Sequence, residues 1–226
     1  MTRISAILAV RDGERYLREA VDSMLGQTRA PDEVIVVDDG STDGTRAILE
    51  SYGSRLRLLT QANQGQGGAL AAGLAVATGD LIAFQDADDV WSADKLEKQG
   101  AVLASDSQAD AIFGMCEQFV SPELGADDQA RFAPPVAIMA GEVAQAMLAR
   151  RTSFERFGGI DRESRGAWFL IWLGRAKAGG MRSAVLPDIV HRRRLHLSNY
   201  GRLNPEERDR HHLSALRRNI LRARGE

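Results

Sequence analysis

Three polar clusters in the sequence combine residue types and spacings that could bind a charged ligand. They are residues 9–12 (Ala-Val-Arg-Asp), residues 38–43 (Asp-Asp-Gly-Ser-Thr-Asp) and residues 86–89 (Asp-Ala-Asp-Asp). Carboxylates held close together repel one another, and a bound cation relieves that repulsion. Carboxylate oxygens favour Mg²⁺ or Mn²⁺, and Mg²⁺ commonly shares its site with substrate phosphates. The clusters therefore predict a site for a nucleoside diphosphate and a divalent cation.

Each cluster follows a segment with the pattern of a buried strand. Apolar runs of strand length alternate with segments that carry helical spacing, which predicts an α/β fold: an open, mostly parallel sheet with helices on both faces. In such a sheet, ligands bind beyond the carboxyl ends of the strands, so the three clusters are expected at one edge. The predicted strands are residues 4–10, 33–37, 56–59, 81–84 and 111–119, and the predicted helices are residues 14–27, 45–52, 69–77 and 94–103.

The second half of the chain is less regular. We expect loops and short elements as far as residue 159, then a helix, a last strand region and a basic C-terminal helix. These segments are a loop at 121–135, a short helix at 141–150, a short strand or turn at 151–159, a helix at 167–178, a strand region at 184–192 and a helix at 206–224.

Composition limits the class of protein. The chain has 226 residues, of which 44% are hydrophobic and 27% charged, which fits a soluble globular protein and argues against disorder. Residues 1–150 carry 12 Lys and Arg against 23 Asp and Glu, whereas residues 151–226 carry 17 against 8, so the second half is basic. The single cysteine, Cys116, excludes an internal disulfide framework and fits a reducing cytoplasm. No apolar run approaches the ~20 residues of a membrane span, and the apolar start is expected to be a strand rather than a signal peptide.

Each cluster also has a simpler interpretation. Residues 38–43 could form only a turn and a helix cap, and residues 86–89 could cap the helix that follows them. The glycines at 65, 67 and 68 could simply let the backbone turn, and they do not make a G-x-G-x-x-G dinucleotide fingerprint. The occurrence of all three clusters in order, at strand ends of one alternating pattern, favours a ligand site.

Residues 3–99 resemble family 2 glycosyltransferases of the GT-A fold. The similarity lies in several motifs with the order and spacing of that family, and thinner matches follow at residues 154–161 and 194–199. The motifs are residues 5–13 (Ser-Ala-Ile-Leu-Ala-Val-Arg-Asp-Gly), 23–28 (Ser-Met-Leu-Gly-Gln-Thr), 34–45, 63–65 (Asn-Gln-Gly), 77–80 (Ala-Thr-Gly-Asp), 84–91 (Phe-Gln-Asp-Ala-Asp-Asp-Val-Trp) and 95–97 (Lys-Leu-Glu).

The resemblance implies a donor site that binds the nucleotide of a nucleotide sugar. Asp39 would accept a hydrogen bond from the base, a uracil-type imide in many members, and Asp38 would support the same loop. Asp86 would lie near the ribose, at the first position of a D-x-D motif. The residues expected to border the nucleoside are Ala9, Val10 and Arg11.

The resemblance also implies a metal site, for Mg²⁺ or Mn²⁺. Asp88, at the second position of the D-x-D motif, is the expected ligand. Arg194 and His196 match an R-x-H element that would close over the diphosphate, with His196 reaching the metal. The simpler interpretation of His196 is a packed or surface imidazole.

The chain departs from the family where inverting members carry a carboxylate base. Trp168 and Ile171 stand in that segment, and no Asp or Glu occurs between residues 165 and 187. The reserve candidates are Glu163, ahead of Asp161, although Asp161 could be a local cap and Glu163 an ordinary surface residue. Trp168 could stack on a sugar face or belong to a buried helix face.

Two functions follow from the resemblance. One is a metal-dependent transferase that moves a sugar, from a UDP-sugar, to an acceptor hydroxyl with inversion; the other is a nucleotide-sugar-binding protein with weak or no transfer. A nucleotidyltransferase is a more distant alternative, because the first strand end lacks a basic glycine-rich loop. We expect one domain with a donor half (1–118), an acceptor half (119–200) and a basic C-terminal helix (201–226). The expected location is the cytoplasm, with that helix packed on the domain or on an anionic membrane surface.

Overall fold

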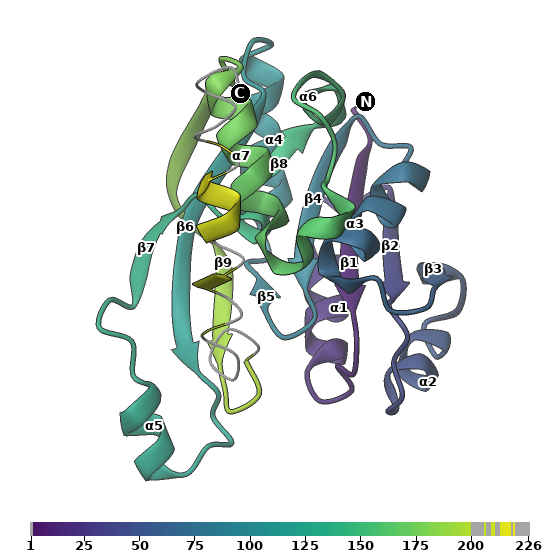
Figure 1. The fold of residues 1–226 in the computed structure, drawn as a ribbon, viewed down its shortest axis with the longest axis vertical. Helices are drawn as coiled ribbons and strands as arrows, with labels where there is room; N and C mark the ends of the chain where they lie inside the picture. Colours follow the sequence, from purple (N-terminus) through teal and green to yellow (C-terminus); the bar gives the residue numbers. More distant parts are fainter. Residues whose placement is uncertain (1, 200–205, 207–208, 211–212, 218, 220–226) are drawn as a thin grey trace.

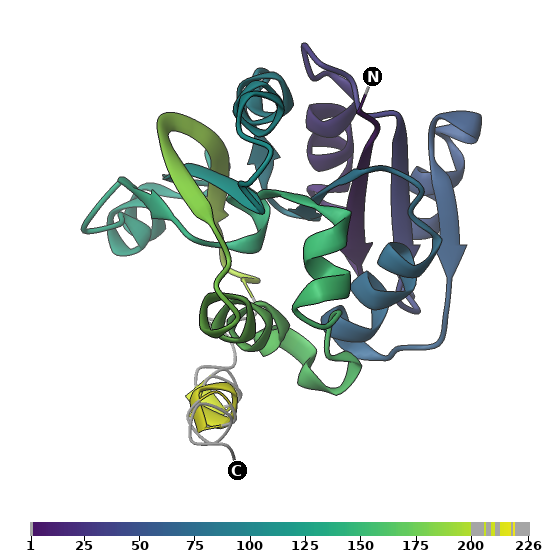
Figure 2. The same ribbon diagram turned by 90° about the horizontal axis from the view of Figure 1, so that it is seen from above.

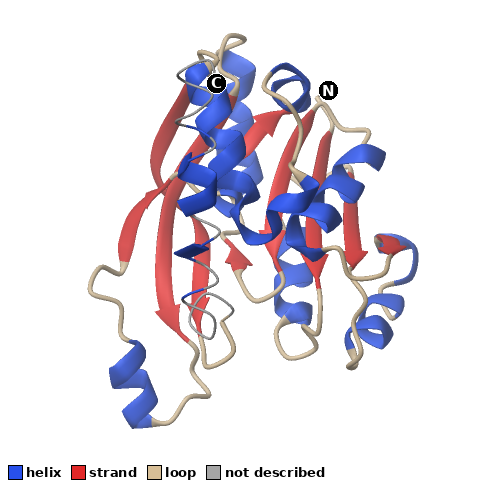
Figure 3. Cartoon of the chain, in the orientation of Figure 1, coloured by secondary structure: helices blue, strands red, loops and turns tan. Residues whose placement is uncertain are grey.

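The computed structural model describes residues 2–199, 206, 209–210, 213–217 and 219. Within these residues the centre is one nine-stranded sheet, in the order β3-β2-β1-β4-β8-β6-β9-β5, with β7 paired to β6. Figure 3 shows the strands in the middle of the molecule and the helices around them. The predicted α/β architecture, an open sheet with helices on both faces, is confirmed.

The N-terminal half of the sheet is parallel. Its strands are continuous Val, Ile and Leu runs because both of their faces are covered. Val10 pairs with Asp38 and Ala9 pairs with Asp86, so the carboxyl ends of three strands meet at one edge. These strands are β1 (Ile4–Val10), β2 (Glu33–Asp38), β3 (Arg57–Thr60) and β4 (Leu81–Asp86).

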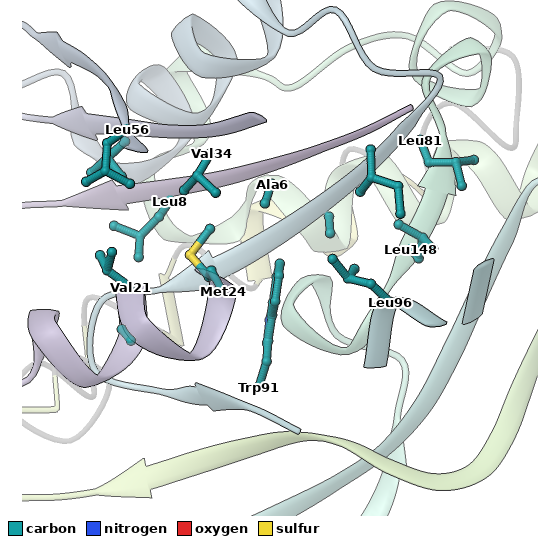
Figure 4. Packing of buried hydrophobic residues seen from close by; sticks show 14 of the residues in the cluster. Ala6, Leu8, Val21, Met24, Val34, Leu56, Leu81, Trp91, Leu96 and Leu148 are labelled. Carbon is teal, nitrogen blue, oxygen red and sulfur yellow. The ribbon is translucent and has the colours of Figure 1, made fainter. Parts of the chain in front are cut away.

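Two hydrophobic layers hold the helices to this sheet (Figure 2). One layer packs α1, α2 and α4 against the strands, and Figure 4 shows Met24, Trp91 and Leu96 inside it. The other packs α3, α6 and α7 against the opposite face. The helices are α1 (Leu17–Leu25), α2 (Thr45–Glu50), α3 (Gly65–Val76), α4 (Lys95–Ser105), α6 (Arg151–Arg156) and α7 (Trp168–Ala178).

The second half of the sheet is mixed. β8 joins the two halves, because it pairs antiparallel with both β4 and β6. β9 runs parallel to β6 for most of its length, and β7 pairs antiparallel with β6. Figure 1 shows α5 at the opposite end of the molecule from α6 and α7. The strands are β5 (Val90–Trp91), β6 (Ala111–Val120), β7 (Ile138–Gly141), β8 (Leu148–Arg150) and β9 (Ser183–Leu195); α5 is Ala126–Phe132, and the 3₁₀ turns are η1 (Gly53–Arg55), η2 (Ala144–Ala146) and η3 (Arg162–Ala167).

Four sequence-based predictions were wrong in detail. The short helix expected at 141–150 is instead the turn η2 followed by β8, and residues 151–159, expected as a strand or turn, begin with α6. Leu148 and Ala149 are fully buried between β4 and β6, and that environment overrides their helical propensity. The helix expected from residue 69 already begins at Gly65, and the expected loop 121–135 contains α5.

Only part of the predicted C-terminal helix lies within the described residues. Residues 206, 209–210, 213–217 and 219 are helical, whereas Arg208, Arg218 and Arg222 lie outside the description. Ala215 is fully buried beside Ala167 and Ile171, so the helix packs on the start of α7 through a small residue. On the same helix, Leu213 and Leu216 are 66% and 51% exposed. Among the described helices, none has the length and apolar content needed to cross a membrane.

Candidate functional site

A cavity of about 470 Å³ lies at the carboxyl edge of β1, β2 and β4. Its volume falls in the range usual for small-molecule sites. Segments far apart in the sequence form its walls. The lining residues are Ala9, Val10, Arg11, Asp12, Gly13, Arg15, Tyr16, Asp39, Asn63, Gly65, Gln66, Ala69, Asp86, Ala87, Asp88, Gly166, His196 and Ser198.

The end of β1 supplies one wall through Ala9, Val10 and Arg11. Asp12 follows with φ of 51°, a left-handed conformation that few residues other than glycine adopt. In this conformation its carboxylate accepts a hydrogen bond from the Thr42 backbone at 2.7 Å, and its own N–H donates to Ser41 Oγ at 3.0 Å. The loops that follow β1 and β2 are thereby tied together.

Asp39 lies at the end of β2 with its carboxylate nearly buried. It accepts three hydrogen bonds, from Gln61 Nε2 at 2.7 Å and from the backbone N–H groups of Gln64 and Gly65 at 2.8 Å each. A carboxylate can accept about four, so the described part of the chain leaves one acceptor position for a ligand in the cavity that Asp39 lines. Asp38 does not line this cavity; it accepts a hydrogen bond from the Ser41 backbone at 2.9 Å and stabilises the loop.

The N-terminus of α3 points into the same region. Gly65, with φ of +78°, makes the turn that starts the helix one residue after Gln64. The Asp39 carboxylate binds the first N–H groups of this helix, an arrangement favoured by the helix dipole. Gln66, in the first turn, lines the cavity and donates to Asp86 Oδ1 at 2.9 Å.

The end of β4 brings three carboxylates together. Ligand atoms of Asp86, Asp88 and Asp89 lie within 4.8 Å of one another. Burial raises the pKa of Asp86 to about 7, and the negative charges of Asp89 and Asp88 act in the same direction. Amide groups of Gln66 and Gln145 bind both oxygens of Asp86, at 2.9 and 2.6 Å. Concentrated negative charge of this kind is the condition that a divalent cation relieves.

Asp89 is turned away from the cavity. Its oxygens accept from the Arg194 backbone N–H at 2.8 Å and lie 3.2 Å from Nε2 of His191, a buried imidazole beneath the cluster. Burial lowers the pKa of His191 to about 3, so this imidazole is neutral at physiological pH. Of the three carboxylates, Asp86 and Asp88 therefore face the cavity.

His196 reaches the cavity from the loop after β9. Its Nε2 lies 3.0 Å from Asp88 Oδ2, and its Nδ1 lies 2.8 Å from Ser198 Oγ. Asn199 holds the loop, accepting from the His196 backbone at 2.7 Å and donating to Asp88 at 3.3 Å. Carboxylate oxygens with one imidazole nitrogen form a donor set that fits Mn²⁺ or Mg²⁺, so Asp88 and His196 fit the predicted cation.

Arg194 is placed differently from the expectation that it binds the nucleotide. It is 3% exposed and does not line the cavity. Its guanidinium donates to the Asp88 carbonyl at 3.0 Å and to Ser121 Oγ at 3.3 Å, and it pairs with Glu19. Here Arg194 joins the acidic turn to α1 and to the end of β6.

The two reserve bases do not line the cavity either. Asp161 caps η3 by accepting from the Glu163 backbone at 3.0 Å, as its simpler interpretation predicted, and Glu163 is exposed. From η3, Gly166 faces the cavity. Trp168 and Ile171 are 2% and 4% exposed and pack in the core, which confirms the buried helix face for Trp168.

Several lining residues escaped the sequence reasoning. Arg15 and Tyr16 were assigned to the first helix, but they precede α1 and line the cavity. Gln66 lay in the glycine-rich loop, and Ser198 lay between two matched positions, His196 and Asn199. Ser198 could have been found from its place within the matched segment 194–199. For Tyr16, the sequence offered only its closeness to the first polar cluster.

Residues 5–125 match the family described as Glycosyl transferase family 2. An uncharacterized glycosyltransferase of Nostoc sp. is 46% identical over 100 residues, which is 42% of this chain and 31% of that protein. The Escherichia coli UDP-Glc:alpha-D-GlcNAc-diphosphoundecaprenol beta-1,3-glucosyltransferase WfgD is 40% identical over 102 residues, 44% of this chain and 40% of that protein. The matched part thus spans less than half the length of either curated relative.

Solved structures share the fold over more of the chain. Mannosyltransferase PcManGT from Pyrobaculum calidifontis, in complex with GDP-Man and Mn²⁺, covers 97% of this chain and 64% of its own, with a TM-score of 0.72 and 24% identity. S. aureus TarS 1–349, in complex with UDP-GlcNAc, covers 88% of this chain and 60% of its own, with a TM-score of 0.68 and 22% identity. The family match over more than half the sequence and the shared architecture lead to one assignment: the chain belongs to glycosyl transferase family 2 and has the GT-A fold.

Proposed function

We propose that this chain binds a nucleotide sugar, a UDP-sugar, with Mg²⁺ or Mn²⁺ and transfers the sugar to an acceptor hydroxyl with inversion. The observation that carries the proposal is the cavity that holds Asp39 at one wall and the Asp88–His196 pair at another. One wall offers a hydrogen-bond acceptor to the nucleobase. The other wall offers ligands to a cation that would accompany the diphosphate.

Each wall has a distinct task in this proposal. The remaining acceptor position of Asp39 would take the imide N–H of uracil, while Ala9, Val10 and Arg11 border the nucleoside. Asp86, fixed by two amide groups, faces the ribose. Asp88 and His196 would hold the cation, which supplies charge neutralisation for the departing diphosphate.

In the transfer step, the acceptor oxygen attacks the anomeric carbon while the bond from that carbon to the diphosphate oxygen breaks. The acceptor proton passes to a base, for which Glu163, ahead of Asp161, is our candidate. The names of relatives support the donor class: TarS was solved with UDP and with UDP-GlcNAc, PcManGT with GDP-Man and Mn²⁺, and WfgD is named as a UDP-Glc enzyme.

A second candidate function is a nucleotide-sugar-binding protein with weak transfer. The observation that favours it is the buried, apolar environment of Trp168 and Ile171, which stand in the segment where the resemblance to inverting family members implies a carboxylate base. General-base catalysis contributes roughly 10²–10⁴-fold, so its loss would slow transfer and leave donor binding intact. We therefore expect tight donor binding and slow transfer.

We also propose a peripheral contact with an anionic membrane surface, at the cytoplasmic side. Leu213 and Leu216 are exposed on the described part of the C-terminal helix, and Arg210 and Arg217 are exposed beside them. Apolar and basic side chains on one helix are typical of interfacial binding. Co-sedimentation with anionic vesicles at low salt tests this contact, and protein left in the supernatant refutes it.

Titration calorimetry with UDP tests the main proposal. We expect binding to tighten when Mn²⁺ is present, and the same protein to release UDP from a UDP-sugar when an acceptor is supplied. Equal UDP affinity with and without Mn²⁺ would refute the metal site. Tight binding without turnover over a panel of acceptors would favour the second candidate.

A further inference from the structure

We propose that Tyr16 and Glu123 are positioning residues that hold the His196 imidazole against Asp88 and so orient the cation site before a cation binds. The inference rests on the proposed role of Asp88 and His196. It concerns two residues that lie outside the predicted ligand set and on different segments of the chain, one before α1 and one after β6.

The Tyr16 ring contacts two side chains from the end of β9. The ring centroids of Tyr16 and His196 are 4.5 Å apart, at an interplanar angle of 52°. On the same ring, the Arg194 guanidinium carbon lies 4.8 Å from the centroid, a distance typical of a cation–π contact. Tyr16 is 9% exposed and His196 3%, so the two rings pack together away from solvent.

The Tyr16 hydroxyl is fixed in turn by Glu123. It donates to Glu123 Oε1, and the other oxygen of this carboxylate accepts from Ser121 Oγ at 2.5 Å. Arg15 lies 3.3 Å from the same carboxylate. Burial acts to raise the pKa of Glu123, but the hydrogen bonds from Ser121 and Tyr16 outweigh it and lower the pKa to about 2, so the anchor is charged at neutral pH.

The imidazole itself has few other constraints. Among the described residues, its Nε2 lies 3.0 Å from Asp88 Oδ2, and its Nδ1 lies 2.8 Å from Ser198 Oγ and accepts from the Ser198 backbone N–H at 3.3 Å. A rotation of the imidazole out of its present plane would break these contacts of its nitrogens. Tyr16 packs against the imidazole and opposes such a rotation. Outer groups that orient metal ligands typically change metal affinity by about 10–100-fold when they are removed.

The first experiment uses the metal-free protein. The ring-current field of Tyr16 displaces the NMR signals of the His196 ring protons, which His196→Asn identifies by their loss. Tyr16→Leu should shift these signals, because it removes the ring current. Tyr16→Phe and Glu123→Ala both keep the ring and both remove the Tyr16–Glu123 hydrogen bond, so both should broaden the signals. Narrow, unshifted His196 signals in both Tyr16→Phe and Glu123→Ala would overturn the inference.

The second experiment measures Mn²⁺ affinity in the presence of UDP. We expect Kd for Mn²⁺ to rise about tenfold or more in Tyr16→Leu, and to rise less in Tyr16→Phe, which keeps the ring but loses its hydrogen bond to Glu123. Tyr52 is the matched control, because its hydroxyl donates to Asp22 at 2.9 Å on the surface formed by α1 and α2. Tyr52→Leu should leave the Mn²⁺ affinity unchanged, and an equal loss in both leucine variants would overturn the specific role of Tyr16.

The two readouts separate this inference from the proposed function. If the wild-type protein binds no Mn²⁺ while Tyr16→Phe and Glu123→Ala still broaden the His196 signals, the metal site is wrong and the positioning contact stands. If wild type binds Mn²⁺ and Tyr16→Leu binds it equally well, the positioning inference fails and the metal site stands. Should Tyr16→Leu fail to fold, Glu123→Ala provides both measurements, with Glu50→Ala as its surface control, since Glu50 pairs with Arg46 in α2.

Discussion

Replacement of Asp39 by asparagine should weaken both the fold and the binding of UDP. The native carboxylate accepts three hydrogen bonds of 2.7–2.8 Å and lies at the N-terminus of α3. Asparagine retains one oxygen and points an N–H₂ group at the Gly65 N–H, which keeps a bond of 2.9 Å to Asn63 Oδ1. One charge-assisted hydrogen bond is worth about 1.5–3 kcal/mol, and a negative charge at a helix N-terminus about 0.3–1 kcal/mol.

We therefore expect the free energy of unfolding to fall by about 2–4 kcal/mol in Asp39→Asn. For a chain of this size, Tm falls by roughly 2–4 °C per kcal/mol, which calorimetry or urea titration resolves easily. The affinity for UDP should fall by about tenfold or more, because the imide N–H then meets a neutral amide in place of a carboxylate.

The matched control is Asp43→Asn. Asp43 also accepts backbone hydrogen bonds, from Thr45 at 3.0 Å and from Glu14 at 3.1 Å, but it does not line the cavity. This variant should lose about 0.5–2 kcal/mol of stability, typical of a lost helix cap, and keep its affinity for UDP. The reasoning is refuted if the two variants lose UDP affinity equally, or if Asp39→Asn matches the wild type in both measurements.

Three further predictions concern the cation, the base and pH. Asp88→Asn should abolish the Mn²⁺ dependence of UDP binding in calorimetry; a retained dependence would contradict the metal assignment. Glu163→Gln should slow transfer by about 10²-fold or more with unchanged UDP affinity, and Asp161→Asn should slow it less; transfer unaffected by both changes would mean that the base lies elsewhere. Burial lowers the pKa of Lys95 well below the 10.5 of an unfolded chain, so between those two pKa values the unfolded state binds a proton that the native state lacks. Unfolding free energy should therefore rise with pH across that window in wild type and in Lys98→Met, and this rise should be absent in Lys95→Met.

The parallel half of the fold was predictable because its signals are local. Runs such as Ile4–Val10 are too apolar for an exposed strand and end in polar turn residues, so the strand and its boundary were both evident. The polar clusters could then be placed at one edge by topology alone, and Asp39, Asp86 and Asp88 do lie on the walls of one cavity. The roles of these three residues stay predictions.

The connecting segments were not predictable in the same way. Leu148 and Ala149 favour a helix in isolation. They form a strand because their backbone pairs with β4 on one side and with β6 on the other. Similarly, residues 151–159 were expected to form a strand or a turn. Phe154, within this segment, instead lies in α6 and stacks on Trp172, with ring centroids 4.6 Å apart. Both outcomes depend on partners that are distant in sequence, so no local pattern carries them.

Within the site, the sequence located residue types better than their orientation. Arg194 was expected to contact the ligand, yet its guanidinium is taken up by Glu19, Ser121 and the Asp88 carbonyl. For Tyr16 the difference runs the other way. It was expected within a helix and not in the site, and the structure places it on the cavity wall. The direction of a long side chain depends on charges supplied by other segments, and a single sequence does not specify it.

The short strand β8 has a consequence for the biosynthesis of the chain. It alone pairs with the outer side of β4, and its residues, Leu148–Arg150, are made long after β4 ends at Asp86. At about 5–20 residues per second, the ribosome needs roughly 3–13 s to add residues 87–150. During that interval the nascent parallel half carries an uncovered strand edge of Leu, Ile, Ala and Phe, which can pair with another chain. Refolding yields and the behaviour of ribosome-bound fragments should therefore change sharply once residue 150 has emerged.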